Sequence, residues 1–140
     1  MEIQGYTMPN DLYYEENHYW IRAEGDVLVM GMDDFAQKLA GEIVYVQLPF
    51  EGKKLTAGKK FAKVESGKWV GKILAPVNGE LIGCNNELET NPLLINQDCY
   101  GKGWMYKIKP NDMEELNNLI HGQEAVEKWL LADIGKYAKD

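Results

Sequence analysis

A chain of 140 residues is long enough for one domain with a substantial core and too short for two. Its composition, 45% hydrophobic and 26% charged, is typical of globular proteins, and no apolar run is long enough to span a bilayer. The net charge of −7 argues against general nucleic-acid binding, which needs a basic face.

The first five residues contain neither a basic region nor an apolar run, which predicts the absence of a secretion signal and a cytoplasmic location. In that reducing compartment the two cysteines, Cys84 and Cys99, are expected to be free thiols. With two histidines and no Cys-x-x-Cys motif, the sequence predicts no metal site.

In chain order, the first predicted elements are a leading segment at residues 8–20, a hairpin and a short helix. Residues 19–30 predict the hairpin because a Glu-Gly-Asp turn signal separates two β-prone runs. Residues 33–40 predict the helix, with Asp33 or the residue before it as its cap, acidic residues in its first turn and Gly41 at its end.

A short pattern, Gly-Glu followed by apolar residues, occurs at residues 41–46 and again at residues 79–84. Each copy is predicted to begin a strand that loops out and returns. Two such units interlock into a flattened β-barrel, with Lys68 between them at one end.

The C-terminal third begins with a predicted strand at residues 101–110. One of its faces carries an alternating set of Trp104, Tyr106 and Ile108. Residues 112–137 show apolar residues at helical spacing and predict two helices that pack on the barrel, separated by Gly122. The fold class is therefore mainly β, a single domain over residues 1–140 with one internal helix and C-terminal helices.

The most informative stretch is residues 60–76, which predicts a strand, a tight turn that presents Lys68, and a second strand. A lysine at the tip of a β-turn is open on nearly every side, as an enzyme requires if it is to attach a cofactor to the ε-amine. Six further lysines within residues 53–72 are opposed only by Glu65. They are either ordinary solvated residues or a basic collar that attracts anionic cargo or an acidic partner.

The hairpin and several other stretches resemble the glycine-cleavage H-protein family. The run Glu65-Ser66-Gly67-Lys68 and the later Pro-Val-Asn-Gly-Glu match the family's Glu-Ser-x-Lys and Pro-x-x-Gly-Glu, and His18-Tyr19-Trp20 stands where the family has His-Glu-Trp. The resemblance implies the lipoyl-domain fold, a barrel-sandwich hybrid, with lipoate attached to Lys68. It also implies a monomeric, non-catalytic carrier that is loaded by a lipoate ligase or by lipoyl synthesis enzymes.

Three positions depart from the family pattern. Where glycine-cleavage members place a Glu, a His and an Asp around the loaded arm, this chain has Tyr19, Leu39 and Lys72. An aminomethyl group is cationic when protonated, so Lys72 would repel it, by about 1 kcal/mol at 4 Å in water and several-fold more near a protein surface. Trp69 offers an apolar face to a dithiolane. Neutral drift on a tolerant surface is the competing explanation.

These departures favour a carrier that has left glycine cleavage. The hairpin is similar to that of the lipoate-binding proteins that accompany heterodisulfide-reductase-like sulfur-oxidising complexes. In this hypothesis Lys68 bears the arm, Lys72 supplies positive potential toward anionic sulfur species, and such a complex is the partner. The remaining residues of the arm environment are His18, Tyr19, Leu39, Glu65, Ser66, Gly67 and Trp69.

Four different functions stay open beside this one. One is a glycine-cleavage H protein with an unusual pocket, whose partners are glycine decarboxylase and aminomethyltransferase. Another is a biotin carrier, although biotin carriers usually flank the lysine with methionines. A third is an unmodified scaffold or lipoyl-relay protein. The fourth is an enzyme that uses Cys84 or Cys99 with His18 or His121, although the spacing does not bring these residues together.

Overall fold

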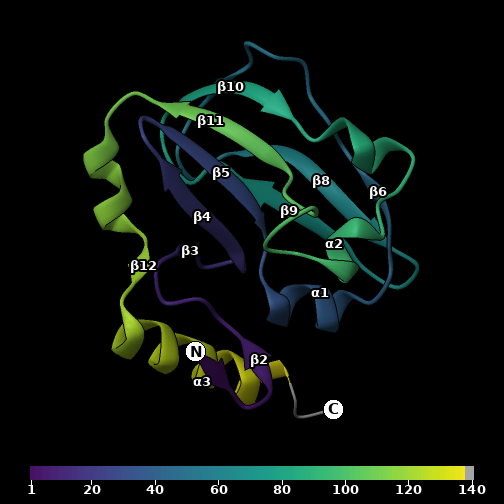
Figure 1. The fold of residues 1–140 in the computed structure, drawn as a ribbon, viewed down its shortest axis with the longest axis vertical. Coiled ribbons are helices and arrows are strands. Elements are labelled where there is room, and N and C mark those ends of the chain that lie inside the picture. The colour runs from purple at the N-terminus through teal and green to yellow at the C-terminus, as the bar shows by residue number, and fades with distance from the viewer. Residues whose placement is uncertain (138–140) are drawn as a thin grey trace.

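Two antiparallel sheets enclose the core in the computed structural model, which describes residues 1–137 (Figure 1). The larger sheet has the order β12-β3-β4-β5-β11-β10-β7, and its strands span, in that order, Ile120–His121, Tyr13–Glu15, Tyr19–Glu24, Val27–Met32, Tyr106–Pro110, Gly79–Cys84 and Lys54–Leu55. The smaller sheet has the order β6-β8-β9, with strands Ile43–Val46, Lys60–Ser66 and Val70–Leu74. A separate ribbon pairs β1 (Glu2–Ile3) with β2 (Tyr6–Thr7).

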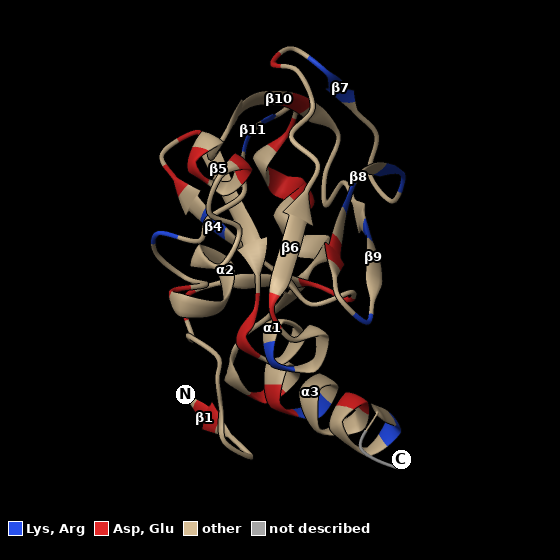
Figure 2. Ribbon diagram, turned by 90° about the vertical axis from the view of Figure 1, so that its right-hand side faces the viewer, with Lys and Arg blue, Asp and Glu red and all other residues tan. Residues whose placement is uncertain are grey.

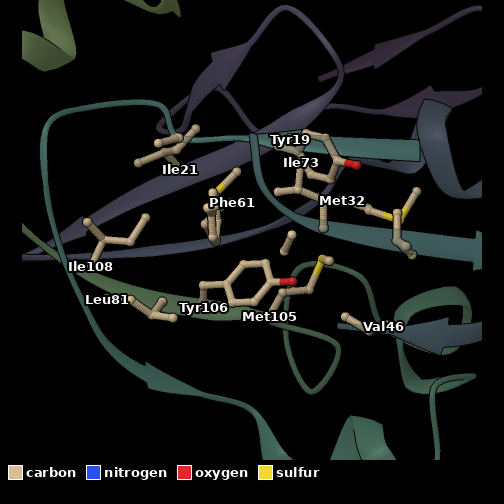
Figure 3. Close-up of a cluster of buried hydrophobic side chains, with 14 of the residues drawn as sticks. Tyr19, Ile21, Met32, Val46, Phe61, Ile73, Leu81, Met105, Tyr106 and Ile108 are labelled. Atoms are coloured by element: carbon tan, nitrogen blue, oxygen red, sulfur yellow. The ribbon is translucent and has the colours of Figure 1, made fainter. Parts of the chain in front are cut away.

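The hydrophobic core is divided by the larger sheet, because side chains alternate between the two faces of each strand. Tyr19 and Ile21 of β4 point into the main cluster between the sheets, which Figure 3 shows with residues of β8, β9, β10 and β11. Trp20, between them, points to a second cluster that includes Val126 and Leu130 of the C-terminal helix. The second cluster therefore fixes that helix against the back of the sheet.

The predicted hairpin and first helix are confirmed. The hairpin is the β4–β5 pair, and the helix is α1 (Asp34–Ala40). An Oδ1 atom of Asp33 accepts a hydrogen bond from the Ala36 N–H at 2.8 Å, which satisfies one of the free donors at the helix start. Gly41 ends the helix at φ 82°, a value that glycine adopts at little cost.

The two copies of the repeated pattern begin strands in different sheets, β6 and β10. Strand β7 follows the first copy in sequence but pairs with β10, so the two units do interlock. The predicted fold class, mainly β with a lipoyl-type barrel, is confirmed.

Two predictions in the middle of the chain need correction. A 3₁₀ helix, η1 (Asn86–Glu89), and a one-turn helix, α2 (Leu94–Gln97), add to the single internal helix that was expected. The strand predicted for residues 101–110 begins only at Tyr106. The preceding residues form a turn around Asp98, whose main-chain and side-chain oxygens accept the N–H groups of Gly103 and Lys102, each at 2.9 Å.

The first of the two predicted C-terminal helices is also different. Residues Met113–Asn118 form a 3₁₀ helix, η2, and Ile120 belongs to β12, which pairs with β3. The spacing of three residues between Met113, Leu116 and Leu119 suits the three residues per turn of a 3₁₀ helix. The second helix is confirmed as α3 (Gln123–Tyr137). Within residues 1–137, no helix is long and apolar enough to cross a membrane.

Candidate functional site

Lys68 lies at the exposed tip of the β8–β9 hairpin. The turn is closed by a hydrogen bond from the Ser66 N–H to the Trp69 carbonyl at 2.8 Å, and the Lys68 N–H donates to the Ser66 hydroxyl at 3.3 Å. The Lys68 side chain crosses the end of α1: a Cβ built on Gly41 would lie 3.3 Å from its Cε. An ammonium group at this place is favoured by the negative end of the helix dipole.

A cavity of about 360 Å³ opens beside the hairpin, between the start of β4, helix α1 and the end of α3. It contains five of the nine residues that the sequence assigned to the site: His18, Tyr19, Leu39, Trp69 and Lys72. The remaining four, Glu65, Ser66, Gly67 and Lys68 itself, belong to the hairpin but do not line the cavity. The tip and the cavity are adjacent in sequence, because Trp69 follows Lys68 directly.

The indole of Trp69 is held in the cavity wall by the absence of a side chain at Gly71. A Cβ at that position would lie 2.1 Å from a carbon of the Trp69 ring, far inside van der Waals contact. Tyr19, buried in the floor, donates a hydrogen bond from its hydroxyl to the Lys72 carbonyl at 3.4 Å. Burial raises the pKa of Tyr19 above its usual range, so its phenol stays neutral.

We expect Gly71→Ala to expel the Trp69 ring from the cavity wall, since the ring is the mobile partner in the clash. The indole N–H signal of Trp69 in a ¹H–¹⁵N spectrum should then move to a solvent-exposed position. Gly67→Ala is the matched control on the same hairpin, because a Cβ at Gly67 meets nothing within 4 Å. Equal shifts in the two variants would show that Gly71 does not position the ring.

Sequence reasoning missed several cavity residues, namely Glu16, Phe35, Val70, Gly71 and Tyr137. Glu16 matters most, because it brings a carboxylate to the cavity that Lys72 also lines, and a cationic group could be attracted there. The three departures at Tyr19, Leu39 and Lys72 therefore do not describe all the charged groups of the cavity. Tyr137 had a detectable signal: it follows Trp129 and Asp133 at intervals of four, on one stripe of α3.

The two cysteines do not form a catalytic pair with either histidine. Burial raises the pKa of Cys84 to about 11 and that of Cys99 to about 12, which keeps both as thiols. His121 donates from Nδ1 to the Leu12 carbonyl and stacks on Tyr13. The ring nitrogens of His18 meet two carboxylates. Within residues 1–137, no group of three or more His, Cys, Asp or Glu side chains could hold a metal ion.

Lysines gather over β7, β8 and β9, whereas acidic residues dominate elsewhere (Figure 2). Two of these lysines are partly neutralised in exposed ion pairs, Lys63 with Glu65 at 3.0 Å and Lys54 with Glu80 at 3.2 Å. Lys68 and Lys72 form no ion pair with the described residues. The hairpin therefore presents positive charge near the tip and the cavity.

Comparison with known proteins adds independent evidence. The family model described as Glycine cleavage H-protein matches residues 12–131. A "Probable glycine cleavage system H protein 2" of Sulfurisphaera tokodaii is 48% identical over 122 residues, 85% of this chain and 82% of that protein. A "Glycine cleavage system H protein" of Anoxybacillus flavithermus is 41% identical over 118 residues, 84% of this chain and 93% of that protein. The crystal structure of a glycine cleavage system H protein from Mycobacterium marinum matches with a TM-score of 0.70 and 32% identity, over 79% of this chain and 97% of that one.

Proposed function

Because the chain belongs to the glycine cleavage H-protein family, whose members are non-catalytic and carry lipoamide covalently on a lysine, we propose that Lys68 bears the lipoyl arm. The observation that carries this assignment is the position of Lys68 at an open hairpin tip next to a cavity with aromatic and apolar walls. The site fits the group: the amine is accessible to a modifying enzyme, and Trp69, Leu39 and Phe35 offer apolar surface to a dithiolane.

The arm supplies a dithiolane that can open and hold a group on sulfur, while the chain contributes presentation and shelter. Lys68 provides the attachment atom, Nζ, on a flexible stem. The hairpin keeps that atom away from the rest of the fold, and the cavity can exclude water from a loaded arm. Partner enzymes perform the reactions, so the carrier needs no general base or nucleophile of its own.

The cargo proposed first is the aminomethyl group of glycine cleavage, carried from glycine decarboxylase to aminomethyltransferase. It is supported by the names of the relatives and by Glu16, whose carboxylate at the cavity favours a cationic amine. The enzymes that attach lipoate, a ligase or the lipoyl synthesis enzymes, are the other partners of this proposal.

The second candidate cargo is an anionic sulfur species passed to or from a heterodisulfide-reductase-like complex. One specific observation favours it: Lys72, a cation without an ion pair among residues 1–137, lines the cavity. The excess of lysines around the hairpin acts in the same direction. Glu16 and Lys72 thus favour opposite cargo charges, and an experiment must decide which one dominates.

The deciding measurement is intact mass, taken on two forms of the lipoylated protein. The disulfide form is incubated with glycine and a glycine decarboxylase, because the S–S bond must open to accept the aminomethyl group as carbon dioxide leaves. The reduced form is treated in parallel with thiosulfate, which can transfer its outer sulfur to a thiolate and release sulfite. We expect the mass of one aminomethyl group in the glycine sample. Lys72→Asp should accelerate this loading about fivefold at low salt, because repulsion is replaced by attraction. Added sulfur without any glycine-derived mass would reverse the order of the two candidates.

If the protein were a biotin carrier or an unmodified relay protein, its mass would differ from that of a lipoyl carrier. Either one would show no lipoyl group on Lys68 when isolated from cells with an active lipoyl ligase. The cytoplasmic location and the monomeric state stay predictions.

A further inference from the structure

His18 makes two contacts with carboxylates through its buried ring. Its Nδ1 lies 2.9 Å from an Oδ2 atom of Asp33, and its Nε2 lies 2.6 Å from an Oδ2 atom of Asp133. The ring is stacked against Trp129 of α3, with ring centroids 4.4 Å apart. It also lies tilted against Phe35 of α1, with ring centroids 4.6 Å apart. One imidazole therefore joins the start of α1 to the C-terminal half of α3.

Because each ring nitrogen of His18 faces a carboxylate oxygen, both nitrogens need a proton to donate. A neutral imidazole has one N–H, so its second nitrogen would turn a lone pair toward a carboxylate oxygen at hydrogen-bond distance. Burial lowers the pKa of His18, but its bonds to Asp33 and Asp133 and their charges outweigh this, and the pKa is raised overall. Glu15, on the segment before His18, is the further carboxylate that interacts with its charge.

The position of Asp133 affects the cavity wall, because Tyr137 follows Asp133 one turn later on α3. Tyr137 lines the cavity and approaches Phe35 of α1, with ring centroids 6.1 Å apart. Besides the contact to His18, the last turns of α3 are held by the partly buried Ile134, which packs on the second cluster, and by the Tyr137–Phe35 contact. The fully buried side chains of α3, Val126 and Leu130, lie nearer its start. Asp133 and Tyr137 also lie beyond residue 131, where the match to the family model ends.

We propose that His18 and Asp133 form a latch that positions the end of α3, with Tyr137, as a wall over the bound lipoyl arm, and that loss of the His18 proton releases this wall. The inference rests on the proposed carrier function, because it assigns the arm to this cavity. His18 and Asp133 are positioning residues, and neither takes part in a reaction.

The direction of the pH dependence follows from the raised pKa of His18. The latch is complete below the ordinary histidine pKa of about 6.5 and is lost as the pH rises through the higher value of the folded protein. Asp33 is fully buried, whereas the Asp133 side chain is 23% exposed. After deprotonation the remaining N–H therefore stays with Asp33, and Asp133 turns to water.

Asp133→Asn tests the latch, and Glu127→Gln, the same charge change at an exposed site on α3, is the matched control. Hydrogen exchange of residues 131–137 is measured on the protein without lipoate between pH 5 and pH 9 and corrected for intrinsic exchange rates. We expect about tenfold lower protection in Asp133→Asn, because the amide oxygen that replaces the carboxylate accepts only a weaker, uncharged hydrogen bond from His18. In the wild type and in Glu127→Gln, protection should fall to that level as the pH rises.

A second measurement addresses the arm itself. On the lipoylated, reduced protein, alkylation by iodoacetamide is compared with that of free dihydrolipoamide at the same pH. We expect several-fold faster alkylation in Asp133→Asn than in Glu127→Gln. Equal protection of residues 131–137 in both variants would overturn the latch. Lower protection with equal alkylation would overturn the role of α3 as a wall and leave the carrier function standing, whereas a protein that accepts no lipoate would overturn the carrier function.

Discussion

Lys68→Arg is expected to abolish lipoylation completely, whereas Lys72→Arg should leave it unchanged. Forming the amide requires the neutral amine of lysine as a nucleophile, and the guanidinium of arginine stays protonated at any pH at which the protein is folded. The substitution keeps the positive charge and the length of the side chain, so recognition of the hairpin is disturbed little. Intact mass after incubation with a lipoate ligase, ATP and lipoate measures the effect directly.

The specificity for Lys68 follows from backbone geometry. Lys68 is at the tip of the turn, whereas Lys72 sits within strand β9, hydrogen-bonded to β8 along its length. Only a residue at the tip can enter the narrow active site of a modifying enzyme without separation of the strands. Lipoyl mass on Lys68→Arg, mapped to another lysine, would contradict this. Equal melting temperatures would show that the variant is folded, since Lys68 is exposed.

The parts of the fold that could be predicted are those with local signals. Helix α1 starts after Asp33, whose side chain caps it, and ends at Gly41, which has a positive φ. Both residue types are recognisable helix-end signals in the sequence. The same is true of the β4–β5 hairpin, whose turn glycine, Gly25, has a φ of 64°. The segment that forms the 3₁₀ helix η2 was predicted as an α-helix because a spacing of three residues fits the first turn of either helix type. Ile120 lies in strand β12 because it pairs with Tyr14 of β3, a contact distant in the sequence.

The cavity was only half predictable, for a similar reason. Residues near Lys68 and those in recognisable motifs, such as Trp69 and Tyr19, were identified. Glu16 and Tyr137 come from a loop and from the last turn of α3, and tertiary packing alone brings them to the hairpin. The electrostatic argument from Lys72 was incomplete because Glu16, a carboxylate that lines the same cavity, is far away in the sequence.

Asp33→Ala is expected to cause the largest loss of stability among single substitutions at the site. Asp33 has no exposed surface, and its two oxygens serve different partners, the Ala36 N–H and the His18 ring. Removing a helix cap costs about 1 kcal/mol, and breaking a buried ion pair costs about 3–5 kcal/mol. Because the two effects share one carboxylate and are not additive, we expect a total of about 3–5 kcal/mol, measured by urea unfolding at pH 6.

Asp33→Asn separates the two contributions. Asparagine caps helices as well as aspartate does but carries no charge, so this variant should retain α1 while it weakens the hold on protonated His18. The pH dependence provides the sharper criterion. In the wild type, the stabilisation from His18 is present below pH about 6.5 and disappears as the pH rises through its raised folded-state pKa. In Asp33→Asn that pKa should move down, and the decline of stability should begin at a lower pH. If the two proteins lost stability over the same pH range, Asp33 would not be what keeps His18 protonated, and the cap alone would have to account for the effect of Asp33→Ala.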